Sequence, residues 1–124
     1  MKSFLVLFAI SLLFMTSCHE RMEPNYACSV SDPLENIGWL SEKVQELEES
    51  PLSSYFFISM ARYKSKTVFI FDNCCPNCAS FVPVINCEGE TIGHIGSGEK
   101  GIDYSRLKDI VVIWKGEDFA CVTR

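Results

Sequence analysis

Apolar residues are concentrated first at the start of the chain. Residues 4–14 are apolar apart from Ser11, and Lys2 supplies one positive charge before them. A charged start followed by a short apolar run is typical of a secretory signal, and the run is too short to cross a bilayer as a permanent helix. Residues 18–31 are polar and show no apolar periodicity. The pattern therefore predicts a signal peptide over residues 1–17 and a tether over 18–31.

A helical pattern follows the polar stretch. Apolar residues recur at steps of three and four between Leu34 and Leu47, while acidic residues fill the other side. The segment Asp32-Pro33-Leu34-Glu35 is typical of a helix start, with Asp32 as the capping residue and Glu35 in the capping-box position. Ser50-Pro51 ends the pattern. The sequence predicts one amphipathic helix, with Trp39 near the edge of its apolar face.

Beyond Pro51 the pattern changes to short alternating and β-branched runs, which predict five strands. The runs cover residues 55–62, 67–71, 80–87, 91–95 and 110–115, and residues 103–108 predict one helical turn. One helix followed by strands with tight connections indicates the α+β class. We expect one N-terminal amphipathic helix packed on a small antiparallel sheet of about five strands, in a single domain over residues 32–124.

Composition limits the partners. The chain has 124 residues and a formal net charge of −5, which suits one small domain with an acidic surface. Nucleic-acid binding would require a basic patch, so no nucleic-acid partner is expected. No run of Lys or Arg predicts attraction to anionic headgroups either. No cofactor and no metal are predicted.

The apolar run ends in Phe14-Met15-Thr16-Ser17-Cys18, which places small residues directly before a cysteine. This segment resembles the lipobox of bacterial lipoprotein precursors, although Met15 stands where that family more often has Leu. The resemblance implies that the leader is removed and that Cys18 carries the lipid. The protein would then lie in the cell envelope, with the membrane as its partner through Cys18. In the alternative interpretation the leader is an ordinary secretory signal, but the A-x-A-like site typical of such signals is absent.

The rest of the chain resembles a group of small lipoproteins from Bacteroidetes-like bacteria. Three segments carry the likeness: Asp32-Pro33-Leu34-Glu35, the nearby Trp39-Leu40, and the closing Ile113-Trp114-Lys115. That group also has cysteines after the second strand. Because its motifs are structural, the resemblance implies a location and a fold and no reaction.

Cysteine usage agrees with export. The chain has seven cysteines, and lipidation of Cys18 would leave an even number free to pair outside the cytoplasm. The remaining six are Cys28, Cys74, Cys75, Cys78, Cys87 and Cys121. We expect a bridge from the Cys74/Cys75/Cys78 group to Cys87 on the adjacent strand, with Cys28 and Cys121 holding down the two tails. The complete pairing does not follow from the sequence.

Two other interpretations of these residues stay open. Cys75-Pro76-Asn77-Cys78 has the C-x-x-C spacing of thiol–disulfide oxidoreductases, in which the first cysteine sits at a helix N-terminus. Pro83 would break a helix that began at Cys78, which counts against a thioredoxin-like site. Cys75, Cys78, Cys87 and His94 could instead form a Cys₃His zinc site or a Cu(I) site, although an oxidising compartment favours disulfides.

The sequence also contains one glycine-rich pattern, and it shows no recognisable pair of a nucleophile and a general base. Residues 96–101 match G-x-G-x-x-G, but that pattern indicates dinucleotide binding only between a parallel strand and a helix.

The leading hypothesis is a membrane-anchored, disulfide-stapled binding or structural module that is not an enzyme and that binds an envelope protein. The alternative is a thiol–disulfide redox or metal-handling protein that uses Cys75 and Cys78.

Overall fold

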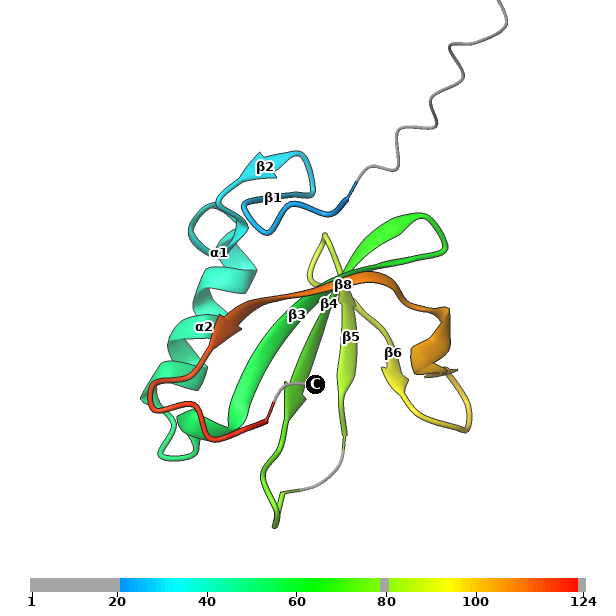
Figure 1. Cartoon of the computed structure of the whole chain (residues 1–124). Helices are drawn as coiled ribbons and strands as arrows, with labels where there is room; N and C mark the ends of the chain where they lie inside the picture. Colours follow the sequence, from blue (N-terminus) through cyan, green and yellow to red (C-terminus); the bar gives the residue numbers. More distant parts are fainter. Residues whose placement is uncertain (1–20, 79–80, 123–124) are drawn as a thin grey trace, which may run out of the picture.

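The computed structural model describes residues 21–78 and 81–122 (Figure 1). The predicted signal peptide over residues 1–17 and the predicted lipidation site Cys18 therefore lie outside the described residues. Within the described part no helix is both long enough and apolar enough to cross a membrane.

A mixed sheet forms the centre of the fold, in the spatial order β7-β6-β5-β4-β3-β8. Its strands are β3 (Phe56–Tyr63), β4 (Lys66–Asn73), β5 (Pro83–Asn86), β6 (Thr91–Ile95), β7 (Gly101–Ile102) and β8 (Lys108–Lys115). All neighbours pair antiparallel except β6 and β7, which are parallel. Single 3-10 turns, η1 (Ser53–Tyr55) and η2 (Tyr104–Arg106), precede β3 and β8.

The α+β class predicted from the sequence is wrong, because the described chain is mostly β. It has a six-stranded mixed sheet and a separate two-stranded hairpin, β1 (Tyr26–Ala27) with β2 (Val30–Ser31), instead of one antiparallel sheet of five strands. The hairpin lies inside the expected tether 18–31. Strands of two residues are too short for period-two alternation to be recognised, which is why the pattern missed both this hairpin and β7.

The parallel pairing of β6 with β7 depends on glycines. Parallel neighbours usually need a crossover of a dozen or more residues, whereas here the connection spans only residues 96–100. Gly96 and Gly98 have φ values of +129° and +100°, which other residues rarely adopt. A Cβ on Gly101 would collide with the carbonyl oxygen of Gly96. The G-x-G-x-x-G match therefore reflects a tight backbone loop, and the element after β7 is the single 3-10 turn η2.

The predicted helix is divided in two. α1 (Pro33–Asn36) is one turn, and α2 (Gly38–Glu49) follows after Ile37, whose φ of −95° and ψ of 106° are extended. The predicted capping box does not form: Asp32 has a left-handed φ of 47°, and its side chain makes no capping hydrogen bond. Its carbonyl oxygen instead accepts hydrogen bonds from the N–H groups of Glu35 and Asn36, at 2.9 and 3.0 Å.

Both faces of the sheet carry a core. On the face covered by α2, Leu40 packs against Ile58, Met60 and Phe69, all with no exposed surface. The opposite face holds a second cluster, namely Ala61, Val68, Ile70, Val84, Ile102 and Leu107. The alternation of side chains along β3 and β4 divides their residues between the two clusters. The central strands are therefore buried on both sides, and the segment from β7 to η2 supplies the cover over the second cluster.

Candidate functional site

All six cysteines that follow Cys18 are joined in disulfides, which confirms the prediction of disulfide bonds. The pairs are Cys28–Cys87, Cys74–Cys121 and Cys75–Cys78. Cys28 and Cys121 each fix one tail of the described chain, but they do so in separate bridges. The expected bridge from the Cys74/Cys75/Cys78 group to Cys87 is wrong.

The direction of β5 explains this error. Because β5 runs antiparallel to β4, Val68 lies opposite Asn86, and the next residue, Cys87, lies beside Thr67 near the start of β4. Cys74 follows the other end of β4. At about 3.4 Å per residue in a strand, seven residues separate the two positions by about 24 Å, far beyond the reach of a disulfide.

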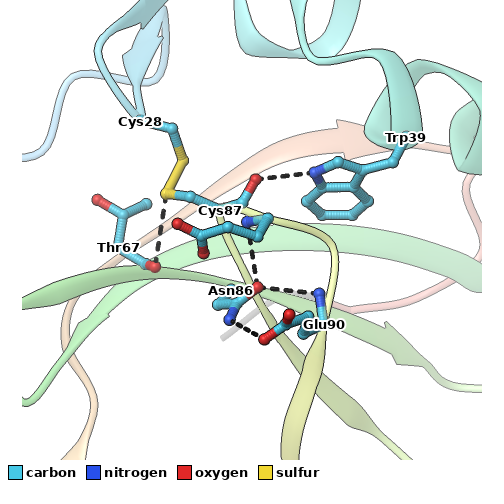
Figure 2. The surroundings of a disulfide bond; sticks show 7 residues. Cys28, Trp39, Thr67, Asn86, Cys87 and Glu90 are labelled. Carbon is cyan, nitrogen blue, oxygen red and sulfur yellow. Dashed lines mark hydrogen bonds between the residues drawn. A yellow bond between two sulfur atoms is a disulfide. The ribbon is translucent and has the colours of Figure 1, made fainter.

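The Cys28–Cys87 bridge joins three elements at one end of the sheet (Figure 2). Cys28 lies in the β1–β2 turn and Cys87 follows β5. The carbonyl oxygen of Cys87 accepts a hydrogen bond of 2.9 Å from the indole Nε1 of Trp39 on α2. The turn after Cys87 is held by the Asn86 side chain, whose Oδ1 accepts hydrogen bonds from the N–H groups of Glu88 and Glu90. The bridge thus connects the N-terminal hairpin, the helix and the β5–β6 turn.

Trp39 reinforces the same junction. Its ring packs edge-on against Phe69 with centroids 5.5 Å apart and lies 6.3 Å from Phe71. Gly89, at a φ of +84°, lies against the indole, and a Cβ there would be 2.9 Å from Cγ of Trp39. Trp39 is therefore a half-buried, hydrogen-bonded residue packed against the edge of the core, and this hydrogen bond could not be foreseen from helical spacing.

The Cys74–Cys121 bridge fixes the C-terminal segment at the opposite end of the sheet. The Cys74 N–H donates to the carbonyl oxygen of Tyr55 at 3.0 Å, and the Ala120 N–H donates to that of Ser54 at 2.9 Å. The ring of Phe119 meets that of Phe57 edge-on at 5.7 Å. The C-terminal segment therefore lies against the η1 turn and the start of β3.

The C-x-x-C bridge closes the smallest loop of the three. Cys75 and Cys78 lie in the connection after β4, where Pro76 and Asn77 are exposed. The Cys75 N–H donates to Oδ1 of Asn73 at 3.3 Å, and the chain continues into β5, a strand that begins at Pro83. A thioredoxin-like site would need a helix in that position. Residues 74–78 and 81–82, which the structure describes around the bridge, form no helix whose N-terminus could acidify the first cysteine, and the two sulfurs lie in a surface loop.

Asp72 is a half-buried carboxylate two residues before this cysteine group. Its side chain lines a pocket of about 390 Å³ with Phe57, Ser59 and Tyr104, on the face opposite α2. Burial raises the pKa of Asp72 above its usual 3.8, because the ionised form loses solvation, while the hydrogen bond from the Asn73 N–H opposes this effect and is the weaker influence.

We expect Asp72→Asn to stabilise the protein at neutral pH. The folded state holds a proton on Asp72 to a higher pH than the unfolded chain, so stability falls as pH rises from 3.8 through the raised pKa, and the full cost remains above it. Asparagine removes this cost and still offers an oxygen to the Asn73 N–H. Thermal unfolding at a series of pH values checks the prediction: the variant should melt higher at neutral pH, with the difference vanishing below pH 3.8.

Asp103→Asn is the matched control, because it should act in the opposite direction. The side chain and backbone of Ser105 hydrogen-bond the exposed Asp103 and lower its pKa, so ionisation there favours the folded state. The Asp103 variant should show no gain at neutral pH. A lower melting temperature for Asp72→Asn at neutral pH would contradict the burial argument.

The residues considered for a metal site are not brought together. Cys75 and Cys78 lie in the loop after β4, whereas Cys87 lies at the opposite end of β4 and is bonded to Cys28. The ring of His94 lies 5.4 Å from that of Phe81, and its Nε2 is 3.3 Å from the carbonyl oxygen of Ser97. In residues 21–78 and 81–122, no group of three or more His, Cys, Asp or Glu side chains is placed so that it could hold a metal ion.

Sequence analysis missed a group of basic residues. The tip of the β3–β4 hairpin carries Arg62, Lys64 and Lys66, and the structure places Arg106 and Lys108 beside it. The signal was present in the run Arg62-Tyr63-Lys64-Ser65-Lys66, which falls across a predicted turn.

Comparisons of the chain with protein-family models, with curated proteins and with solved structures gave no match.

Proposed function

We propose that the protein is a lipoprotein of the cell envelope, held at the membrane by lipid on Cys18, and that it acts outside the cytoplasm as a binding or structural module rather than as an enzyme. The observation that carries the proposal is the pairing of the cysteines. The six cysteines after Cys18 satisfy one another in three disulfides, so Cys18 is the odd cysteine and follows the small residues of a lipobox-like segment.

General physical chemistry supports both a place outside the cytoplasm and attachment to a membrane. Disulfides persist in oxidising compartments and are rare where cytosolic reductants act. An acyl chain contributes about 0.8 kcal/mol for each buried CH₂, and stable anchoring takes more than one chain, which a diacylglycerol with an added acyl group supplies. Covalent lipid on Cys18 therefore suffices to hold a small acidic domain at a membrane.

The module interpretation is supported by how the bridges are distributed. Cys28–Cys87 fixes the N-terminal hairpin at one end of the sheet, and Cys74–Cys121 fixes the C-terminal segment at the other. A scaffold constrained at both ends presents its hairpin tips with little freedom, which reduces the entropy lost when a partner binds.

A thiol–disulfide function is the second candidate, and the exposed loop of Cys75–Cys78 is the observation that favours it. In such a reaction a partner dithiol would attack this bridge and become a disulfide, while Cys75 and Cys78 become thiols. Reduction of insulin by the native protein, lost in a Cys75→Ser/Cys78→Ser variant, would support this function over the module.

The lipid anchor is tested by labelling growing bacteria that produce the protein with radioactive palmitate. The wild-type chain should incorporate the label, lose residues 1–17 and sediment with membranes. Cys18→Ser should incorporate no label and keep its leader, because the acceptor thiol is missing. Label retained in Cys18→Ser, or absent from the wild type, would contradict the proposal.

Cysteines elsewhere in the chain provide the control for this experiment. The Cys75→Ser/Cys78→Ser variant removes two sulfurs from an exposed loop and leaves Cys18 intact. It should incorporate palmitate as the wild type does, which separates specific lipidation at Cys18 from general acylation of thiols.

A further inference from the structure

One end of the sheet carries a cluster of basic residues on a protein whose net charge is acidic. The chain has 11 basic and 16 acidic residues, yet five of the basic residues meet at the tip of the β3–β4 hairpin and the adjoining start of β8. We define the basic patch as Arg62, Lys64, Lys66, Arg106 and Lys108.

Pairing and ring contacts bring these residues together. Arg62 of β3 is in register with Lys108 of β8. Nζ of Lys64 and Cζ of Arg106 each lie 5.2 Å from the ring centroid of Tyr63, so the ring holds two cations from separate segments. All members of the patch are exposed except Arg62, which is half-buried.

Four carboxylates of the described chain lie around the five cations of the patch, and one of them is Asp103, whose pKa is lowered by hydrogen bonds with Ser105 and in part by the charge of Arg106. Asp109 pairs with Arg62, with 3.5 Å between Oδ2 and Nη1. Glu88 lines a pocket together with Lys64 and Lys66, and Glu23 lines another with Arg62. The described tip therefore keeps a small excess of positive charge, with five cations against these four carboxylates.

The basic patch lies beside the point at which the described chain begins. Arg21 and Met22 line the same pocket as Arg62 and Thr67. Figure 1 shows the segment that leads into β1 above the end of the sheet from which the β3–β4 hairpin projects. Cys18 precedes Arg21 by three positions in the sequence, and a fully extended chain advances at most about 3.6 Å per residue, so the intervening chain can span at most about 11 Å.

The Cys28–Cys87 bridge restricts where the segment after Arg21 can lie relative to the sheet. It ties the β1–β2 hairpin to the end of β5 that lies beside the start of β4. The segment after Arg21 therefore cannot swing freely around the sheet. A lipid on Cys18 would bring the basic end of the domain, and not the opposite end, close to the bilayer surface.

We propose that the basic patch contacts the headgroups of anionic phospholipids in the membrane that holds the protein. This inference rests on the proposed lipid anchor for its geometry. The screening length is about 8 Å at physiological ionic strength, so the patch acts on a nearby surface with little influence from the acidic side chains at the far end of the sheet. Each basic side chain near an anionic membrane contributes about a fivefold gain in binding.

Vesicle sedimentation tests the patch without using the lipid on Cys18. The full chain carrying Cys18→Ser is mixed with vesicles of phosphatidylcholine alone, or with one third phosphatidylglycerol. Adding Lys64→Gln and Lys66→Gln should weaken binding to the anionic vesicles about 20-fold. Raising the salt concentration should remove the difference, because the contact is screened.

The matched control is Lys100→Gln with Lys115→Gln in the same background. These exposed lysines lie toward the other end of the sheet: Lys115 is in register with Phe57, and the carbonyl of Lys100 accepts from the His94 N–H. The control has the same net charge as the test variant and the same leader. Its binding should stay within about twofold of the parent, because its lysines lie more than a screening length from the surface.

Two results would overturn the inference. Equal losses in both double variants would mean that net charge, and not the patch, governs binding. Equal binding to neutral and anionic vesicles, unaffected by Lys64→Gln and Lys66→Gln, would mean that the patch does not bind anionic headgroups. Neither result depends on Cys18, whose lipidation is tested separately by palmitate labelling.

Discussion

Replacing Cys28 and Cys87 together by alanine is expected to lower the free energy of unfolding by about 4 kcal/mol. The loss arises because this bridge closes a long loop, with a sequence separation of 59 between its cysteines, and therefore restricts the unfolded chain strongly. The same change frees the β1–β2 hairpin from the β5–β6 turn. Denaturant unfolding under non-reducing conditions measures the effect.

The Cys75→Ala/Cys78→Ala variant is the matched comparison for this prediction. Its cysteines have a sequence separation of only 3, so loop closure predicts a loss of about 2 kcal/mol. The surface position of the loop leaves little other packing to lose. Equal losses for the two variants, or a larger loss for Cys75→Ala/Cys78→Ala, would mean that loop closure does not set the stabilisation that Cys28–Cys87 provides.

Phe69→Ala is expected to destabilise the protein by about 3–5 kcal/mol. Phe69 is fully buried at the centre of β4, is in register with Met60 and packs against the indole of Trp39. Alanine would remove most of the ring's contacts and leave a cavity between α2 and the sheet. Denaturant midpoints with unchanged slopes would measure this loss directly.

Phe81→Ala is the control for the core substitution. Phe81 is 58 % exposed and contacts the ring of His94, so its removal should change the free energy of unfolding by no more than about 0.5 kcal/mol. If Phe69→Ala were as mild as Phe81→Ala, the core between α2 and the sheet could not be packed as described.

Regular periodicity made the longer elements predictable. The three- and four-residue steps between Leu34 and Leu47 located the helix, and runs of alternating residues located most of the long strands. Asp32 shows the limit of such patterns. It occupies the expected capping position, but its left-handed backbone leaves the side chain out of the cap, and dihedral angles of this kind depend on the preceding hairpin and not on the local sequence.

The short elements decided the fold class and could not be predicted. β1, β2 and β7 have two residues each, and β7 pairs parallel with β6 only because the glycines between them permit a tight loop. Sequence analysis had no signal for pairing of this kind. Counting the two-stranded hairpin and β7 changes a small antiparallel sheet with a helix into a mostly β domain.

The number of cysteines predicted that disulfides form, but it did not predict which cysteines pair. Export and an even count predicted bridges among the six cysteines, which is confirmed, but nearness in the predicted strand order suggested a wrong partner for Cys87. Antiparallel pairing places Cys87 beside Thr67 and leaves Cys74 at the far end of β4. The basic patch was missed for a related reason, since Arg106 and Lys108 join the hairpin tip only through the sheet.

Peptide mass spectrometry of the protein extracted from membranes without reductant tests the cysteine assignments most directly. We expect an N-terminal peptide that begins at Cys18 and carries the mass of a diacylglycerol and an acyl group. We also expect three linked pairs, Cys28–Cys87, Cys74–Cys121 and Cys75–Cys78. A chain that still begins at Met1, a disulfide that includes Cys18, or Cys87 linked to the Cys74/Cys75/Cys78 group would contradict these assignments.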